Sequence, residues 1–217
     1  MRLLQERPLP SNNHPQSLSG LYAITPQNSD DLSLFKNVEA ALVGGVRVLQ
    51  YREKQLTGVD KEQRARTLLV MCQRYQVPLI INDDVELALA IGADGVHLGR
   101  DDVSIEQARA QLPENRIIGV SCYNRLPLAV AAAEAGADYV AFGSFFPSST
   151  KPEAVAASFD LIEKFKQQYS LPVVAIGGIT PSGAETLFEA GADMVAVISY
   201  LFDAPCPKVA AQQFPTR

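Results

Sequence analysis

Cysteine and histidine are scarce in this chain, and their positions exclude the commonest sites built from them. The three cysteines, Cys72, Cys122 and Cys206, are an odd and scattered set with no paired spacing for zinc or a disulfide framework. The two histidines, His14 and His97, form no spacing pattern with serine or cysteine that indicates a catalytic constellation. We therefore interpret His97 as an interior residue rather than a general base, and Cys122 as a packing residue rather than a nucleophile.

Long apolar runs and an excess of basic residues are also missing. No apolar stretch approaches the roughly 18 residues of a membrane span, and the first ten residues lack the apolar middle region of a secretory signal. The formal charge is −5 over 217 residues, and the cations stand in short clusters, which argues against a nucleic-acid partner. These absences predict a cytoplasmic protein without a membrane or nucleic-acid partner, and they leave room for a homo-oligomer.

What the chain has in abundance is an alternation of short apolar runs with amphipathic segments. The runs are apolar on both faces and flanked by Gly, Asp or Pro, which is typical of buried parallel strands. Strands are predicted over residues 21–24, 46–50, 79–82, 95–98, 117–121, 139–142, 173–176 and 194–198. Helices are predicted between them, over residues 60–75, 105–112, 127–135, 157–169 and 181–190.

This alternation predicts an α/β fold, a single (β/α)8 TIM barrel over residues 20–217. Residues 1–19 are rich in Pro, Ser, Asn and Gln without periodicity, and we expect a short, flexible N-terminal arm there. A doubly wound open sheet is the alternative, and it would gather its site at one or two switch points instead of around a full mouth.

An internal repeat supports repeated helix–loop–strand units. Gly-Ala-Asp occurs at 92–94, 136–138 and 191–193, each time where a helix is predicted to end and a strand to begin. Glycine supplies the left-handed residue that ends a helix. The spacing of roughly 45 to 55 residues is longer and less regular than that of a solenoid.

Acidic residues follow two successive predicted strands. Asn82, Asp83 and Asp84 follow the first, and Asp101 and Asp102 follow the second. Because a parallel barrel gathers the carboxyl ends of its strands at one mouth, these side chains are predicted to meet there. One carboxylate from each strand end, together with substrate phosphates, would suit Mg²⁺. The alternative is that they cap the following helices, and Asp84 and Asp101 are the better candidates for caps.

Cations and hydroxyls follow other predicted strands. Gln50, Arg52 and Lys54 alternate along an extended segment and so project to one side, which favours anion binding. The alternative is a solvated strand end in which Glu53 pairs with one of these cations. Ser148, Ser149, Thr150 and Lys151 form a second cluster at residues 148–151, a weaker signal that gains weight from its place at a strand end.

Two glycines and a hydroxyl follow the last two predicted strands. Gly177 and Gly178 precede a helix for which Thr180 is the predicted N-cap, and Ile198 and Ser199 end the final strand. Barrels often seat a phosphate between these two loops, on backbone N–H groups. This is the most specific single signal in the chain.

With these clusters in place, the chain resembles the thiamine-phosphate synthase family from about residue 20 to 202. The matching motifs are QYREK, INDDVELA, GADGVHLGRDD, GVSC, STKP, AIGGIT and VAVIS, in the family's order and spacing. The resemblance implies a TIM barrel that is a transferase in thiamine biosynthesis. It implies a reaction that joins a pyrimidinylmethyl diphosphate to a thiazole phosphate and releases diphosphate.

The resemblance also implies roles for individual residues. The Mg²⁺ ligands would be Asp83 and Asp102. The pyrimidine diphosphate would be held by Gln50, Arg52, Lys54, Asn82, Ser121 and Lys151. The thiazole phosphate would be held by Ser148, Thr150, Gly178, Ile198 and Ser199. Catalytic roles are expected for Arg52, Lys54, Ser121 and Lys151. Arg100 stands where the family commonly has Gln.

Two alternatives use the same barrel. A thiazole tautomerase would not need a metal-bound diphosphate, so the presence of Asp83, Asp102, Arg52 and Lys54 argues against it. A non-catalytic thiazole-phosphate-binding barrel would usually have lost one or more of the clusters, and none is missing here.

Overall fold

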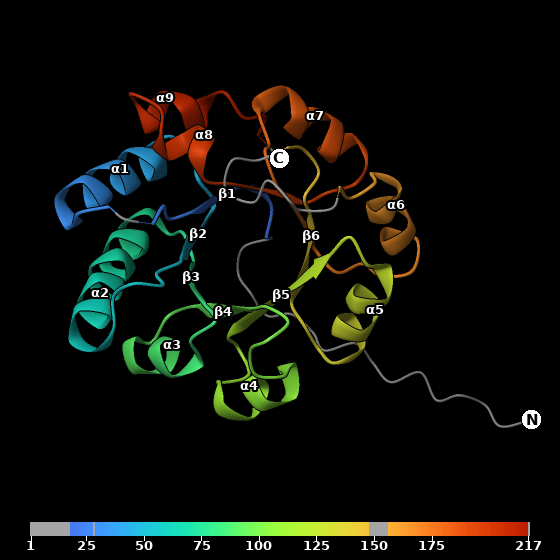
Figure 1. The fold of residues 1–217 in the computed structure, drawn as a ribbon, viewed down its shortest axis with the longest axis horizontal. Helices are drawn as coiled ribbons and strands as arrows, with labels where there is room; N and C mark the ends of the chain where they lie inside the picture. Colours follow the sequence, from blue (N-terminus) through green and yellow to red (C-terminus); the bar gives the residue numbers. More distant parts are fainter. Residues whose placement is uncertain (1–17, 28, 148–155, 217) are drawn as a thin grey trace, which may run out of the picture.

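Eight parallel strands close into a barrel in sequence order, from β1 to β8 and back to β1, in the computed structural model (Figure 1). The structure describes residues 18–27, 29–147 and 156–216. The strands are β1 (Gly20–Ile24), β2 (Val48–Tyr51), β3 (Leu79–Asn82), β4 (Gly95–Leu98), β5 (Ile117–Tyr123), β6 (Tyr139–Gly143), β7 (Val173–Ile176) and β8 (Met194–Val197). The predicted TIM barrel is confirmed, and the open sheet is excluded.

Helices surround the barrel and cover the outer faces of the strands (Figure 1). They are α1 (Asp31–Val43), α2 (Gly58–Tyr75), α3 (Val85–Ile91), α4 (Ile105–Gln111), α5 (Leu126–Glu134), α6 (Asp160–Lys166), α7 (Pro181–Glu189), α8 (Ser199–Phe202) and α9 (Pro207–Gln212). Among the described residues, no helix is both long and apolar enough to cross a membrane. Of the expected N-terminal arm, only residues 18 and 19 lie within the described ranges. Residues 148–151 lie outside them.

The core has two layers, as a barrel requires. The larger layer lies between strands and helices and contains residues such as Leu49, Ile81 and Phe142. The smaller one fills the barrel interior and includes Tyr22, Ile80, Tyr139 and Met194. Strands of this kind are buried on both faces, which is why their sequences are nearly continuous apolar runs. The interior is therefore packed, and the open space lies above it at the mouth.

The aspartates of the Gly-Ala-Asp repeat join neighbouring strands. Each carboxylate accepts a hydrogen bond from a backbone N–H at the start of the preceding strand: Asp94 from Leu79 at 2.8 Å, Asp138 from Ile118 at 2.7 Å, and Asp193 from Val173 at 2.8 Å. Two of them also form ion pairs, Asp138 with Arg109 and Asp193 with Lys166. The repeat thus marks both the end of a helix and a cross-strand tie at the amino-terminal end of the barrel.

Predicted boundaries hold for most elements, with one clear exception. Helix α6 begins at Asp160 and ends at Lys166, within the predicted range 157–169. The N–H of Ala157 donates to the carbonyl oxygen of Ser144 at 2.7 Å, so this residue is tied to the segment after β6 and cannot start the helix. The predicted N-cap of α7 is confirmed, since Thr180 Oγ1 accepts from the N–H of Gly183.

Candidate active site

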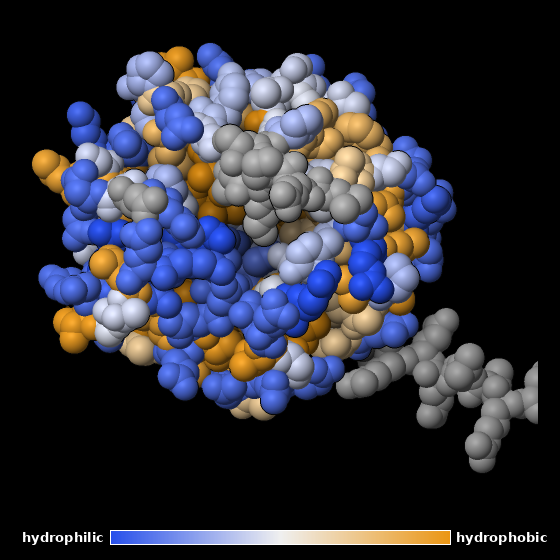
Figure 2. Space-filling model, in the orientation of Figure 1, coloured by the Kyte–Doolittle hydropathy of each residue, from blue (hydrophilic) through white to orange (hydrophobic). Residues whose placement is uncertain are grey.

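A cavity of about 620 Å³ opens at the carboxyl ends of the strands. Hydrophilic residues gather around a hollow near the centre of the face seen in Figure 2, where the barrel is viewed end-on. The predicted site residues that line the cavity are Gln50, Arg52, Lys54, Asn82, Asp83, Asp102, Ser121, Gly178, Ile198 and Ser199. The structure therefore brings together every predicted site residue that it describes. Ser148, Thr150 and Lys151 lie outside the described residues.

Two carboxylates face each other on the wall formed by β3 and β4. Asp83 has a left-handed backbone (φ 65°), and its N–H donates to the carbonyl oxygen of His97 at 2.9 Å. Burial raises the pKa of Asp83, and so do its hydrogen bond to Asp102 and the charge of that residue. Lys54 Nζ lies 3.6 Å from Asp83 Oδ2 and partly offsets this effect. Crowded carboxylates of this kind favour a bound cation.

The other two aspartates of these clusters behave differently from one another. Asp84 is the N-cap of α3 and accepts from the N–H of Leu87 at 2.9 Å, as predicted. The prediction that Asp101 caps the next helix is wrong, because Ser104 caps α4 in a capping box with Gln107. Asp101 lines the cavity instead. Ser104 supplies the same kind of oxygen acceptor, and the loop after β4 is long enough to place it at the helix start.

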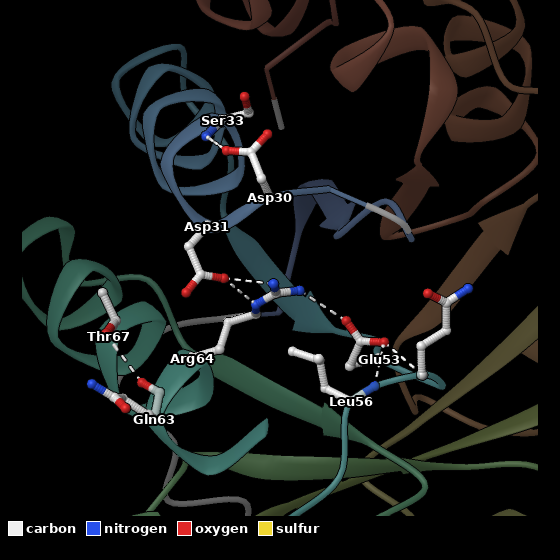
Figure 3. A network of polar contacts seen from close by, with 9 residues as sticks. Asp30, Asp31, Ser33, Glu53, Leu56, Gln63, Arg64 and Thr67 are labelled. Atoms are coloured by element: carbon white, nitrogen blue, oxygen red, sulfur yellow. Dashed lines mark hydrogen bonds and ion pairs between the residues drawn. The ribbon is translucent and has the colours of Figure 1, made fainter. Parts of the chain in front are cut away.

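Gln50, Arg52 and Lys54 line one wall of the cavity, as their alternation predicts. The alternative pairing of Glu53 with one of these cations is not found. Among the described residues, Glu53 instead forms an ion pair with Arg64 of α2 at 2.9 Å (Figure 3). Glu53 also accepts from the N–H groups of Gln55 and Leu56, so it points away from the cavity and fixes the loop that carries the two cations. Arg52 and Lys54 are thus not paired with Glu53, and both line the cavity, with Lys54 beside Asp83.

The glycine turn after β7 is shaped so that only glycine fits. Gly177 and Gly178 both have positive φ, 106° and 60°. A Cβ on Gly178 would collide with the carbonyl oxygen of Pro147, and one on Gly177 would collide with Ser144. Both glycines line the cavity beside the start of α7, and the neighbouring strand β8 ends there too, where Ile198 and Ser199 begin α8. Exposed backbone N–H groups at such a turn can bind phosphate.

Several cavity residues were missed by sequence reasoning. They are Tyr22, Arg100, Tyr123, Thr180 and Tyr200. Arg100 lies over the ring of Tyr123, 4.7 Å from its centroid, so it is held against an aromatic face. Tyr22 lies within an apolar run and looks like a core residue, so no signal marked it. Tyr123 and Tyr200 directly follow the motifs GVSC and VAVIS, and that position could have indicated them.

His97 is an interior residue, as predicted, yet it also reaches the cavity. Its Nε2 lies 2.8 Å from Ser121 Oγ, and its Nδ1 lies 2.9 Å from the hydroxyl of Tyr139. Burial lowers the pKa of His97 to about 4, so the imidazole is neutral near pH 7. Cys122 is buried, and burial raises its pKa to about 12, which agrees with a packing role.

Comparison with known proteins identifies the family to which this site belongs. A family model described as thiamine monophosphate synthase matches residues 21–201. The chain belongs to the thiamine monophosphate synthase family. It is similar to the thiamine-phosphate synthase of Thiobacillus denitrificans, with 52% identity over 89% of this chain and 92% of the relative. It is also similar to that of Methylobacillus flagellatus, with 53% identity over 91% and 94%.

Solved structures agree with this family. The thiamine phosphate pyrophosphorylase of Pyrococcus furiosus superposes with a TM-score of 0.81 at 33% identity, over 90% of this chain and 93% of that chain. A 3-hexulose-6-phosphate synthase superposes with a TM-score of 0.64 at 13% identity, over 90% and 97%, and shows the fold alone. The predicted family, fold and transferase class are confirmed.

Proposed function

We propose that this family member joins 4-amino-2-methyl-5-pyrimidinylmethyl diphosphate to 4-methyl-5-(2-phosphoethyl)thiazole, giving thiamine phosphate and diphosphate. The observation that carries the proposal is that one cavity is lined by two different sets of residues suited to anions. Arg52, Lys54 and the acidic pair occupy the wall of β2 to β4, and Gly178 and Ser199 occupy the wall of β7 and β8. In a closed barrel of eight strands these walls lie opposite each other.

The first wall suits the diphosphate of the pyrimidine substrate. Arg52 and Lys54 offer a planar fork and a point charge to phosphate oxygens. Asp83 and Asp102 would hold Mg²⁺, and the crowding of their carboxylates fits such an ion. In the described part of the chain no three His, Cys, Asp or Glu side chains cluster, so the remaining ligands would come from the diphosphate and water. A bound Mg²⁺ would supply charge neutralisation for the departing diphosphate.

The second wall suits the phosphate of the thiazole. The N–H groups around Gly178 and the start of α8 at Ser199 provide neutral donors to a phosphate. Ser148, Thr150 and Lys151 remain predicted contacts with the two substrates. Ser121 at the end of β5 is the predicted contact for the pyrimidine ring, between the two walls.

The reaction needs positioning and charge stabilisation rather than an activated nucleophile. The bond from the pyrimidinyl methylene carbon to the diphosphate oxygen breaks, and the electron pair leaves with diphosphate. The lone pair of the thiazole nitrogen then forms the new carbon–nitrogen bond, and no proton is transferred. Arg52 and Lys54 stabilise charge that develops on the leaving group. The cavity holds the thiazole nitrogen near the pyrimidinyl methylene carbon, so that the bond forms in an effectively unimolecular step within the bound complex.

The deciding experiment incubates the purified protein with both substrates and Mg²⁺ and measures thiamine phosphate. A parallel sample contains EDTA, and a third uses Asp83→Asn, which keeps the size and the left-handed backbone of that position. We expect product only in the first sample. Absence of product with retained binding of the thiazole phosphate would overturn the proposal and favour a tautomerase or a non-catalytic barrel. Full activity of Asp83→Asn would overturn the metal assignment alone.

A further inference from the structure

A continuous chain of hydrogen bonds crosses the barrel interior beneath the cavity. It runs from Gln50 Nε2 to the Tyr22 hydroxyl at 2.9 Å, then to the Tyr139 hydroxyl at 2.8 Å. It continues to His97 Nδ1 at 2.9 Å and from His97 Nε2 to Ser121 Oγ at 2.8 Å. The five residues come from β2, β1, β6, β4 and β5, and four of them line the cavity while Tyr139 lies below it. The chain therefore begins and ends at residues that face the substrate.

The donor at Gln50 sets one direction for the hydrogen bonds of this chain. An amide nitrogen only donates, so the Tyr22 oxygen accepts from Gln50. Among the described residues the other partner of the buried Tyr22 hydroxyl is Tyr139, so Tyr22 donates its proton to the Tyr139 oxygen. Tyr139 must then donate to His97 Nδ1, which is therefore the unprotonated ring nitrogen.

The direction of the chain determines whether the Ser121 hydroxyl donates or accepts a hydrogen bond on the side of the cavity. A neutral imidazole that accepts at Nδ1 carries its proton on Nε2 and donates it to Ser121 Oγ. The Ser121 oxygen is thus already an acceptor inside the protein, and its own proton is directed toward the cavity. An acceptor atom of a bound molecule would complete the chain, whereas an amino group would place two donors face to face.

We propose that Tyr22, Tyr139 and His97 are positioning residues that fix the Ser121 hydroxyl as a hydrogen-bond donor, so that Ser121 binds an acceptor atom of the substrate. Under the proposed function, on which this second part rests, the acceptor is a ring nitrogen of the pyrimidine rather than its exocyclic amino group. Gln50, on the opposite side of the interior, sets the direction of the whole chain.

The direction of the chain can be read at His97 without any substrate. The sequence contains only two histidines, His14 and His97, so ¹⁵N-histidine labelling gives two imidazole spectra, and His14→Gln assigns them. A long-range ¹H–¹⁵N correlation at pH 8 shows which ring nitrogen is protonated. We expect the proton of His97 on Nε2. A proton on Nδ1, or a charged imidazolium, overturns the proposal, and this result needs no variant that might fail to fold.

Reversal of the chain is the sharper test. Gln50→Glu replaces the amide donor by a carboxylate that only accepts, so every bond should reverse and the His97 proton should move to Nδ1. Gln55→Glu is the matched control, since it adds the same charge at an exposed position outside the chain. It should leave the proton on Nε2. An unchanged tautomer in a folded Gln50→Glu protein overturns the role of Gln50 and of the two tyrosines.

The acceptor is identified by binding of pyrimidine diphosphate analogues to wild type and to Ser121→Ala. Replacing the ring nitrogen that faces Ser121 by C–H should weaken binding to wild type about tenfold, and should have little further effect in Ser121→Ala. Ser121→Thr keeps the hydroxyl and should retain the discrimination. The assignment is wrong if the analogue that lacks the exocyclic amino group, rather than the one that lacks the ring nitrogen, loses affinity for wild type but not for Ser121→Ala. If no pyrimidine diphosphate binds, the proposed function fails while the tautomer result stands by itself.

Discussion

Substitution of Arg64 by Met should uncouple the loop that carries Arg52 and Lys54. Arg64 joins α2 to Glu53 of this loop at 2.9 Å and to Asp31 of α1 at 2.7 Å (Figure 3). The Arg64 and Glu53 side chains are 11% and 4% exposed, so this pair is buried. Methionine keeps the aliphatic stem and removes only the guanidinium, which isolates the electrostatic effect.

The magnitude follows from the burial of Glu53. Removing one partner of a buried ion pair costs roughly 3–5 kcal/mol, because the remaining charge is uncompensated. Glu53 keeps the N–H groups of Gln55 at 2.7 Å and Leu56 at 3.2 Å, which places the loss near the lower end, about 3 kcal/mol. The Asp31 side chain is 60% exposed, so loss of its ion pair with Arg64 adds little to the loss of unfolding free energy. For a chain of this size we expect a Tm lower by about 6–12 °C.

Urea unfolding of four proteins tests this reasoning: wild type, Arg64→Met, Glu53→Gln and the double variant. The double variant should recover about 2 kcal/mol relative to Arg64→Met, because the amide introduced by Glu53→Gln still accepts the two N–H bonds and is neutral. Arg66→Met is the control on the same helix, where an exposed pair with Glu62 should cost under about 1 kcal/mol. A loss below about 1 kcal/mol in Arg64→Met, or no recovery in the double variant, would refute the reasoning.

Three further variants address the cavity itself. Asp83→Asn should have a Tm equal to or above that of wild type, because it removes the repulsion between the two carboxylates. Mg²⁺ should raise the Tm of wild type but not that of Asp83→Asn. An equal rise in both proteins would contradict the metal site. Gly178→Ala should weaken thiazole phosphate binding, measured by calorimetry, at least tenfold, since φ is 60° and the Cβ meets Pro147; unchanged affinity would contradict the phosphate seat. The unfolded state protonates His97 below about pH 6.5 and the folded state only near pH 4, so stability is lost as pH falls between these values, by about 3 kcal/mol at most. In His97→Asn this part of the pH dependence of the unfolding free energy, measured by urea unfolding, should vanish. If the unfolding free energy of His97→Asn fell with pH as steeply as that of wild type, His97 would not be its source.

The architecture and most of the cavity wall could be predicted from the order of the residues. Short apolar runs flanked by Gly, Asp or Pro are recognisable because strands buried on both faces have little choice of residue. Polar clusters such as those at Asp83 and Gly178 stand out because they end such runs, and the barrel places all strand ends at one mouth. No knowledge of packing was needed to expect these side chains in one site.

The partners of those residues depend on the folded chain. Glu53 stands between two cations in the sequence, yet its partner is Arg64, because the loop turns the carboxylate toward α2. Asp101 resembles a cap, yet Ser104 lies at the helix start. In both cases the spacing of residues in the sequence limits which partners a side chain can reach, and the path of the loop decides which of these partners it contacts.

The interior hydrogen-bond chain is the clearest case of this kind. Tyr22 and Tyr139 are 117 residues apart and belong to strands whose sequences are apolar throughout. In such strands no alternation of polar and apolar residues shows which side chains point into the barrel. Closure and strand tilt decide it, since they bring side chains of β1, β4 and β6 across the interior to one another. The barrel and its mouth could thus be read from the residues alone, whereas only the closed barrel placed the side chains that orient Ser121.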